Sequence, residues 1–343
     1  MLQRAEALTD DFVPGDVVHR HREIEQLAGI VRPVLDGEPA EHGMLFGPSG
    51  VGKTCMAKYT LQTIEQTYLG VHTVHIDCWQ YHTRRKAIEQ LCLGCGRGAI
   101  LHQELAHDTL LDRVRDVEDP YIVVLDEIDQ LDDLTLLREL YGMEGVSIIG
   151  IANRERDLYS RVDDWLNTRL RICQTIKPEP YSDDELVAII NRRADQALAS
   201  GSIRDEQLER IARASDGNAG LAIGALRQAA RRAQQRGADR ITDDLIEQAI
   251  PAAVREERQK SISRLTHDQR VLFEQLPADG SWLRAERLHN AYEAIADEPT
   301  GRRNRRNWLS KMNQYNLVEK QGQGRGTEYR RVDVEDTELL TEL

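Results

Sequence analysis

Eight consecutive residues combine small, flexible positions with a lysine and a hydroxyl group. They are Gly47, Pro48, Ser49, Gly50, Val51, Gly52, Lys53 and Thr54. This G-x-x-x-x-G-K-[ST] pattern follows an apolar run at 44–46 and precedes a helical pattern, which is the strand-loop-helix context that a phosphate loop requires. Glycines let backbone N–H groups turn toward phosphates, and the new helix adds its positive end. We therefore predict a triphosphate site, with Lys53 on the β and γ phosphates.

Acidic side chains follow a second apolar run, which starts at Tyr121. Asp126 ends that run, at the edge where open α/β sheets bind ligands. We predict that Asp126 and the Thr54 hydroxyl hold Mg²⁺, and that Glu127 polarises the water that attacks ATP. A solvated turn is the simpler explanation of an Asp-Glu pair, but the phosphate loop upstream favours the nucleotide interpretation. The expected ligands are thus ATP or ADP with Mg²⁺.

A third apolar run covers 146–152, and Asn153 is the first polar residue after it. A side-chain amide at a strand end could hold the attacking water or contact the γ phosphate. As a plain turn residue it would cap the next segment instead. We count Asn153 as a catalytic candidate beside Glu127.

A sheet is needed to bring these side chains to one edge. Apolar runs predict strands at 44–46, 71–77, 121–126, 146–152 and 171–176, with helical patterns between them. Continuous apolar runs are typical of strands buried on both faces of a parallel sheet. We therefore predict an α/β fold, a three-layer α/β sandwich with a parallel sheet, over residues 1–180.

Helical periodicity replaces the strand patterns beyond residue 180. Residues 181–251 predict a small all-helical domain whose fourth helix starts at 241–244 and is short. A separate charged linking helix is expected at 252–264. Helices at 265–275, 282–296 and 302–315 and a glycine-tipped hairpin at 317–332 predict a winged helix-turn-helix domain over 252–343. The acidic end, 333–343, is expected to be a frayed tail.

Basic residues gather in one part of an acidic chain. The 343 residues have a formal net charge of −13, whereas residues 300–331 hold nine basic and two acidic side chains, a net charge of +7. Arginines and amides suit base edges and phosphates, and an arginine at the wing tip could enter a minor groove. The alternative is a solvated basic face that docks on an acidic surface. The DNA-binding candidates are Arg302, Arg303, Arg305, Arg306, Asn307, Lys311 and Arg325.

Cysteine usage and hydropathy indicate the compartment. Five cysteines, an odd number, suit reduced thiols better than a disulfide framework. The single C-x-x-C, at Cys92 and Cys95, has no partner pair, so zinc or redox chemistry is not expected. The sequence contains neither a run of 18 apolar residues nor a signal-peptide pattern. We expect a cytoplasmic protein that does not bind membrane.

The order of these motifs resembles a known family. Gly-Pro-Ser-Gly-Val-Gly-Lys-Thr at 47–54, Val-Leu-Asp-Glu-Ile-Asp at 124–129, Ile-Ile-Gly-Ile-Ala-Asn at 148–153 and the terminal winged helix are similar to those of archaeal replication initiators of the AAA+ class. That family is related to the origin recognition complex and the cell-division-control helicase loader. The resemblance covers about residues 12–331. It implies ATP-dependent binding to double-stranded origin DNA, self-association on DNA and recruitment of the replicative helicase.

The resemblance also assigns further site residues. Arg161 occupies the slot of an arginine finger that acts across a subunit boundary, with Arg169 as a weaker candidate and a surface salt bridge as the simpler explanation of either. The segment before the phosphate loop resembles an arm that closes over the adenine. Its candidate contacts are Val17, Val18 and Arg22. An ordinary capping arm without ligand contact is the alternative.

The lid departs from the family pattern. Its helix usually begins Gly-Asp-Ala-Arg, and the arginine senses the γ phosphate. Here the residues at 217–220 are Gly-Asn-Ala-Gly, and Gly220 cannot supply a positive charge. We expect slow hydrolysis with ATP acting mainly as a switch, or substitution by Arg227.

Two other functions share some of these motifs. A AAA+ winged-helix transcription or plasmid-maintenance regulator would bind operator DNA with the same residues. A metabolic kinase would use the phosphate loop, but Asp126, Glu127, Asn153 and the basic winged helix would have no role in it. The DNA target separates the first alternative from an initiator.

Overall fold

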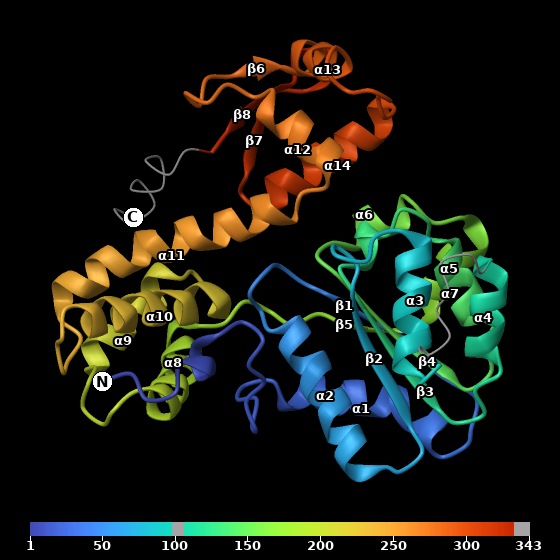
Figure 1. Ribbon diagram of the computed structural model, residues 1–343, viewed down its shortest axis with the longest axis horizontal. Helices are drawn as coiled ribbons and strands as arrows, with labels where there is room; N and C mark the ends of the chain where they lie inside the picture. Colours follow the sequence, from blue (N-terminus) through green and yellow to red (C-terminus); the bar gives the residue numbers. More distant parts are fainter. Residues whose placement is uncertain (98–105, 333–343) are drawn as a thin grey trace. The chain divides into compact units, whose positions relative to one another are not determined.

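A computed structural model describes residues 1–97 and 106–332 of the chain. The chain divides into two compact units (Figure 1). The sheet unit comprises residues 10–189 and 216–220, and the helical unit comprises residues 1–9, 190–215 and those from 221 onward. The tail at 333–343, for which we expected fraying, lies outside the described residues. The helices that the structure describes include no apolar stretch of the length that a membrane span requires.

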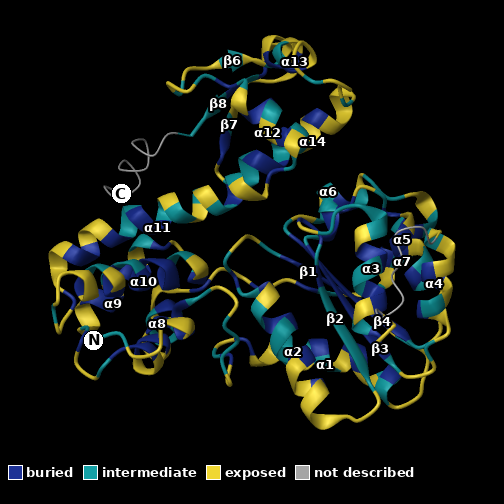
Figure 2. Ribbon diagram, in the orientation of Figure 1, coloured by how far each residue is buried: buried dark blue, intermediate teal, exposed yellow. Residues whose placement is uncertain are grey.

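A five-stranded parallel sheet forms the centre of the sheet unit, in the order β2-β3-β4-β1-β5. The strands are β1 (Gly43–Phe46), β2 (His72–Asp77), β3 (Tyr121–Asp126), β4 (Val146–Ala152) and β5 (Gln174–Ile176). Every residue of β1, β3 and β4 is buried, as Figure 2 shows in dark blue. The continuous apolar runs therefore predicted these strands correctly, because both faces of a parallel sheet are covered.

The fifth predicted strand, 171–176, is wrong in its first half. Arg171 and Ile172 belong to helix α7 (Asp164–Ile172), and β5 begins only at Gln174. The helix starts at a good cap, since the Asp163 side chain accepts a hydrogen bond from the N–H of Leu166 at 2.8 Å. The hydrogen bonds of the helix then extend to the N–H of Cys173, which donates to the Arg169 carbonyl. Too few residues are left before Ile176 to form the six-residue strand that was predicted.

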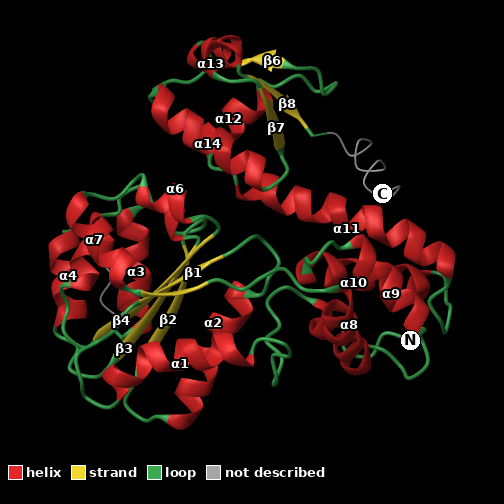
Figure 3. Cartoon of the chain, turned by 180° about the vertical axis from the view of Figure 1, so that it is seen from behind, coloured by secondary structure: helices red, strands yellow, loops and turns green. Residues whose placement is uncertain are grey.

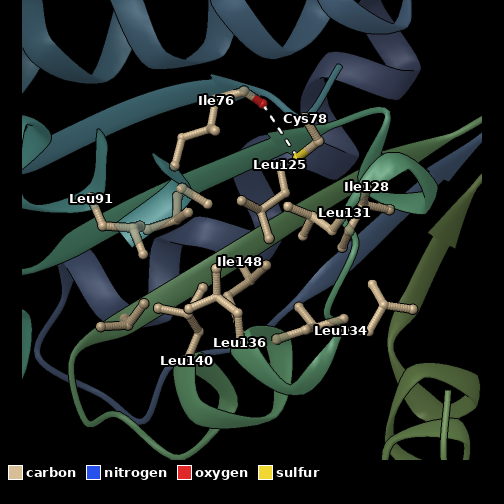
Figure 4. Packing of buried hydrophobic residues seen from close by; sticks show 14 of the residues in the cluster. Ile76, Cys78, Leu91, Leu125, Ile128, Leu131, Leu134, Leu136, Leu140 and Ile148 are labelled. Atoms are coloured by element: carbon tan, nitrogen blue, oxygen red, sulfur yellow. Dashed lines mark hydrogen bonds between the residues drawn. The ribbon is translucent and has the colours of Figure 1, made fainter. Parts of the chain in front are cut away.

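Helices cover both faces of the sheet and complete the predicted three-layer sandwich. On one face, α1 (His21–Leu35) and α2 (Lys53–Thr67) pack on Ile122 and Val124 of β3. On the other face, Val123 and Leu125 pack with α3 (Arg84–Gly94), α4 (His107–Arg115), α5 (Thr135–Tyr141) and α7. Figure 4 shows Leu125 packed with Ile76 and Ile148 on this second face. A short helix, α6 (Glu155–Tyr159), follows β4.

Four helices follow the sheet: α8 (Asp183–Ala197), α9 (Asp205–Ala214), α10 (Ala219–Gln235) and α11 (Asp243–Arg264). The expected short fourth helix and separate linking helix are wrong, because α11 runs through both as one helix. The boundary that we drew between 251 and 252 falls inside it, next to Pro251. Residues on both sides, including Ala249 and Ala252, are buried, so packing holds the helix together where the proline removes a hydrogen bond.

The last part of the chain is a winged helix-turn-helix (Figure 3). Its helices are α12 (His267–Glu274), α13 (Ala285–Glu293) and α14 (Arg302–Gln314). Its antiparallel sheet has the order β6-β8-β7, with β6 (Leu283–Arg284), β7 (Val318–Gln321) and β8 (Glu328–Arg331). The second helix begins three residues later than expected from the sequence, because Leu283 and Arg284 pair with β8 instead.

Candidate functional site

The loop between β1 and α2 has a backbone that only glycine adopts easily. Gly50 and Gly52 have φ angles of 81° and 89°. A Cβ on Gly50 would overlap the Asn218 side chain, and one on Gly52 would lie 2.7 Å from the Tyr181 hydroxyl. The loop ends where α2 begins at Lys53. The result is an open turn of backbone N–H groups in front of a helix N-terminus, which suits a phosphate.

Lys53 joins the two ends of this site. Lys53 is only 6% exposed. Its Nζ donates to the carbonyl oxygens of Gly47 and Pro48, each at 2.7 Å, and to Oδ1 of Asn153 at 3.0 Å. The amine therefore lies inside the loop, and the end of β4 brings Asn153 to the same place. These two predicted residues meet although they are far apart in the sequence.

Thr54 and Asp126 also meet, as the magnesium prediction requires. Thr54 Oγ1 donates to Asp126 Oδ2 at 2.6 Å. His75 Nε2, which sequence reasoning missed, lies 3.1 Å from the same oxygen. Burial alone would raise the pKa of Asp126, but the hydrogen bonds from His75 and Thr54 and the charge of Lys53 outweigh it and hold this pKa below its usual range. A hydroxyl beside an ionised carboxylate is a donor set that suits Mg²⁺.

Glu127 adopts an unusual backbone directly after Asp126. Its φ angle is 53°, in the left-handed region that non-glycine residues rarely enter. The residue is half-buried and leads into a 3-10 turn (Ile128–Gln130). Such strain is found at functional positions more often than elsewhere, which is consistent with the catalytic role predicted for Glu127.

Both arginine-finger candidates bind groups of their own chain. Arg161 is half-buried and donates to the carbonyl oxygens of Asp129 and Leu131, and burial lowers its pKa. Arg169 lies over the ring of Trp165, with Cζ 3.5 Å from the ring centre. Arg161 would have to leave two carbonyl groups before it could reach a neighbouring subunit.

The arm before α1 and the first turn of that helix, which holds Arg22, differ in detail from the prediction. Val17 is buried, Val18 is half-buried and Arg22 is exposed. The buried arginine of this arm is Arg20, whose Cζ lies 3.9 Å above the Tyr181 ring centre and whose Nη2 donates to the Glu179 carbonyl at 2.5 Å. In the sequence, Arg20 and Arg22 look alike. Only the start of α1 at residue 21 distinguishes them.

The start of α10 contacts the phosphate loop without an arginine. The N–H of Ala219 donates to the Gly50 carbonyl at 3.0 Å. Gly220, in the slot of the missing arginine, is exposed. Arg227 belongs to the helical unit, where it donates to the Leu8 carbonyl at 2.8 Å and lies 3.0 Å from Glu256. Arg227 is thus committed to other partners, which argues against the substitution that we considered.

The winged helix separates the predicted DNA-binding residues into two groups. The exposed group is Arg302, Arg303, Arg306, Asn307 and Arg325. Arg305 and Lys311 are 2% and 7% exposed, so the expectation that they lie on the DNA face is wrong. Arg305 donates to the His289 carbonyl at 2.9 Å and pairs with Glu293, and Lys311 lies over the Tyr315 ring.

Family models match the two parts of the chain that carry this site. The AAA ATPase domain model matches residues 16–147, and the Cdc6 AAA+ ATPase-type lid domain model matches residues 187–251. Together with the phosphate loop and the parallel sheet, these matches define a AAA+ ATPase with a Cdc6-type lid.

Similar proteins extend the match to nearly the whole chain. ORC1-type DNA replication protein 9 of Halobacterium salinarum is 36% identical over 335 residues, which are 97% of this chain and 94% of that protein. ORC1-type DNA replication protein 1 of the same organism is 36% identical over 309 residues, 90% of this chain and 100% of that protein. The chain therefore belongs to the family of ORC1-type DNA replication proteins, which confirms the resemblance seen in its motifs.

A solved structure shows the same fold. The ORC1 protein of Aeropyrum pernix, solved in complex with DNA, has a TM-score of 0.75 and 21% identity, over 98% of this chain and 96% of that one. The predicted fold class, a AAA+ sandwich followed by a helical lid and a winged helix, is confirmed.

Proposed function

We propose that this chain is an ATP-binding replication initiator that binds origin DNA through its C-terminal winged helix and helps to recruit the replicative helicase. The main support is the row of exposed arginines at the start of α14, in a chain that also carries a phosphate loop. Its membership of the ORC1-type DNA replication proteins and the DNA complex of the Aeropyrum pernix relative point the same way.

In the nucleotide site, the chain's own groups bind and orient the triphosphate. The loop from Gly47 to Gly52 presents backbone N–H groups, and Lys53 would exchange its carbonyl acceptors for phosphate oxygens. Thr54 and Asp126 would hold Mg²⁺, which supplies charge neutralisation of the phosphates. The arm with Val17, Val18 and Arg22 covers the adenine, and Arg20 fixes that arm on Tyr181.

Hydrolysis is proposed to be slow. Glu127 orients the attacking water and Asn153 holds the γ phosphate together with Lys53. Gly220 offers no positive charge, and Arg161 remains on its own chain until a second subunit on DNA engages it. ATP then serves mainly as a switch between two states of the initiator.

The DNA face comprises the exposed residues at the start of α14 and the wing tip. Arg302, Arg303, Arg306 and Asn307 would contact phosphates and major-groove base edges, and Arg325 would enter a minor groove. Each phosphate contact adds to the salt dependence of binding, because counterions are released.

DNA binding is tested by replacing Arg302, Arg303 and Arg306 together with Ala. We expect at least about tenfold weaker binding and a salt slope reduced by roughly 2–3. A triple replacement of Arg204, Arg213 and Arg236, exposed on the lid, removes the same charge as a control. Footprints on repeats beside an unwinding element support an initiator, and footprints on promoters support the regulator. Equal salt slopes for the two triple variants would contradict the assigned face.

Nucleotide binding is tested with two variants on α2, one at the end of the phosphate loop and one further along the helix. Lys53→Ala should weaken ATP binding by about 100-fold or more, because it removes a buried charge-assisted donor. Lys58→Ala is the control, since Lys58 lies on the same helix as Lys53 but pairs with Asp11, at 3.1 Å. Glu127→Gln should retain binding and stop turnover. Titration with a fluorescent ATP analogue measures the affinity of each variant. Unchanged affinity in Lys53→Ala would overturn the assigned nucleotide site.

A further inference from the structure

Asp126 receives hydrogen bonds from two different elements on one oxygen. Thr54 is on α2 and His75 is on β2, and both reach Oδ2. An ionised carboxylate only accepts hydrogen bonds, so His75 must carry a proton on Nε2 to donate. Two donors from separate elements restrict rotation of the carboxylate far more than one does.

The strand register explains how His75 reaches this place. In the parallel pair, His75 is opposite Val124 and Asp77 is opposite Asp126. Paired residues share a face of the sheet, and Val124 packs on the α1 and α2 side. His75 therefore projects to the face on which α2 begins. Asp77 shares this face and accepts a hydrogen bond from the Trp79 N–H at 2.9 Å.

Burial makes this contact strong. The side chains of His75 and Asp126 are 19% and 9% exposed. A hydrogen bond to a charged group in such a place is worth more than one in water, and it is costly to lose. Ile122 and Val124 lie on the same face of β3, and as apolar residues they need no hydrogen-bond partner.

We propose, building on the nucleotide function proposed above, that His75 is a positioning residue for the magnesium-organising acid. It fixes the orientation of the Asp126 carboxylate so that Asp126 and Thr54 present their oxygens together. Loss of His75 then weakens Mg²⁺ binding at the nucleotide site, so that more Mg²⁺ is needed to support nucleotide binding, and leaves the phosphate loop itself intact.

The test measures binding of a fluorescent ATP analogue in EDTA and during a Mg²⁺ titration. For His75→Ala we expect affinity in EDTA within about twofold of the parent and a half-saturating Mg²⁺ concentration raised about fivefold to tenfold. His75→Gln keeps an N–H donor near the Nε2 position and should restore the parent value to within about twofold. His72→Ala is the matched control, since His72 is on the same strand but faces Asp119 at 3.7 Å.

Each outcome separates this inference from the nucleotide function. A parent protein that fails to bind the analogue overturns the proposed function itself. A parent that binds, with a Mg²⁺ requirement unchanged in His75→Ala, overturns only the role of His75. Equal defects in His75→Ala and His75→Gln would do the same, because they would reflect the loss of ring packing and not of the donor.

Discussion

At the residue scale, neighbouring arginines of α14 have different tasks. Arg305, Leu309 and Met312 recur at helical spacing, and all three are buried. Arg303 and Arg306 point off this stripe and are exposed, whereas Arg302 continues its spacing and is exposed as the first residue of the helix. The spacing therefore distinguishes Arg303 and Arg306 from Arg305, but not Arg302. We nevertheless grouped all four arginines by charge, because an arginine on an apolar stripe is uncommon.

Arg305→Ala is therefore expected to act on stability. The change leaves the His289 carbonyl without this donor, takes from Glu293 the closer of its two arginine partners, Arg305 and Arg302, and removes packing on the Tyr292 ring. We expect a loss of about 2–3 kcal/mol in the free energy of unfolding, measured by denaturant titration. Arg303→Ala, at an exposed position of the same helix, should change it by less than about 0.5 kcal/mol. Full stability of Arg305→Ala with weakened DNA binding would return Arg305 to the DNA face.

At the element scale, the sequence predicted the elements that a local residue pattern is enough to determine. The buried strands β3 and β4 and the phosphate loop followed from apolar runs and one motif, and their meeting at one sheet edge followed from parallel topology. The contact between His75 and Asp126 did not, because it depends on the register of β2 against β3. Nor did the continuity of α11, because tertiary packing overrides the break that Pro251 suggests.

The packing of α13 against α14 predicts sensitivity to acid. Burial, followed by the charges of Arg305, Arg302 and Arg306, lowers the pKa of His289 from 6.5 to about 4, and Glu293 opposes this only weakly. Between these values the unfolded chain binds a proton that the folded domain does not, so stability is present above pH 6.5 and falls as the pH decreases. We expect a loss of about 2 kcal/mol from pH 7 to pH 4.5.

His289→Leu tests this origin of the acid sensitivity. The variant has no group to protonate and leaves no buried Nδ1 without a partner, so it should unfold at nearly the same denaturant concentration at both pH values. In the sheet unit, burial also lowers the pKa of His42 to about 4, so this histidine adds its own loss of stability in acid. The quantity to compare is therefore the difference in acid-induced stability loss between His289→Leu and the parent. If both proteins lost the same stability between pH 7 and pH 4.5, the acid sensitivity would come from a group other than His289.

At the scale of the whole molecule, the chain passes repeatedly between its two units. Residues 1–9 belong to the helical unit, residues 10–189 to the sheet unit, and residues 216–220 return to the sheet unit between two helical segments. The returning segment carries the hydrogen bond from Ala219 to the Gly50 carbonyl of the phosphate loop. The arm before α1 and the segment that contacts the phosphate loop are therefore both covalently continuous with the helical unit.

The first nine residues are a structural part of the helical unit. The N–H groups of Gln3 and Arg4 donate to the Ala197 carbonyl at 2.7 and 3.1 Å, and Leu2 forms a bridge with Leu198. Ala7 and Leu8 are 0% and 1% exposed. Their carbonyl groups accept hydrogen bonds from two buried arginines, Arg193 at 3.0 Å and Arg227 at 2.8 Å.

Removal of residues 1–9 should therefore destabilise the helical unit, although it removes no predicted ligand contact. The lost burial of Leu8 and the loss of one buried carbonyl acceptor for each of the two arginines together cost about 3 kcal/mol or more. We expect a lower melting temperature and faster proteolysis within 190–264. Arg4→Ala with Glu6→Ala, an exposed ion pair of the same segment, should leave both unchanged. An unchanged melting temperature in the shortened chain would show that the burial of Leu8 adds nothing measurable to stability. The nine residues would then lie on the helical unit without stabilising it.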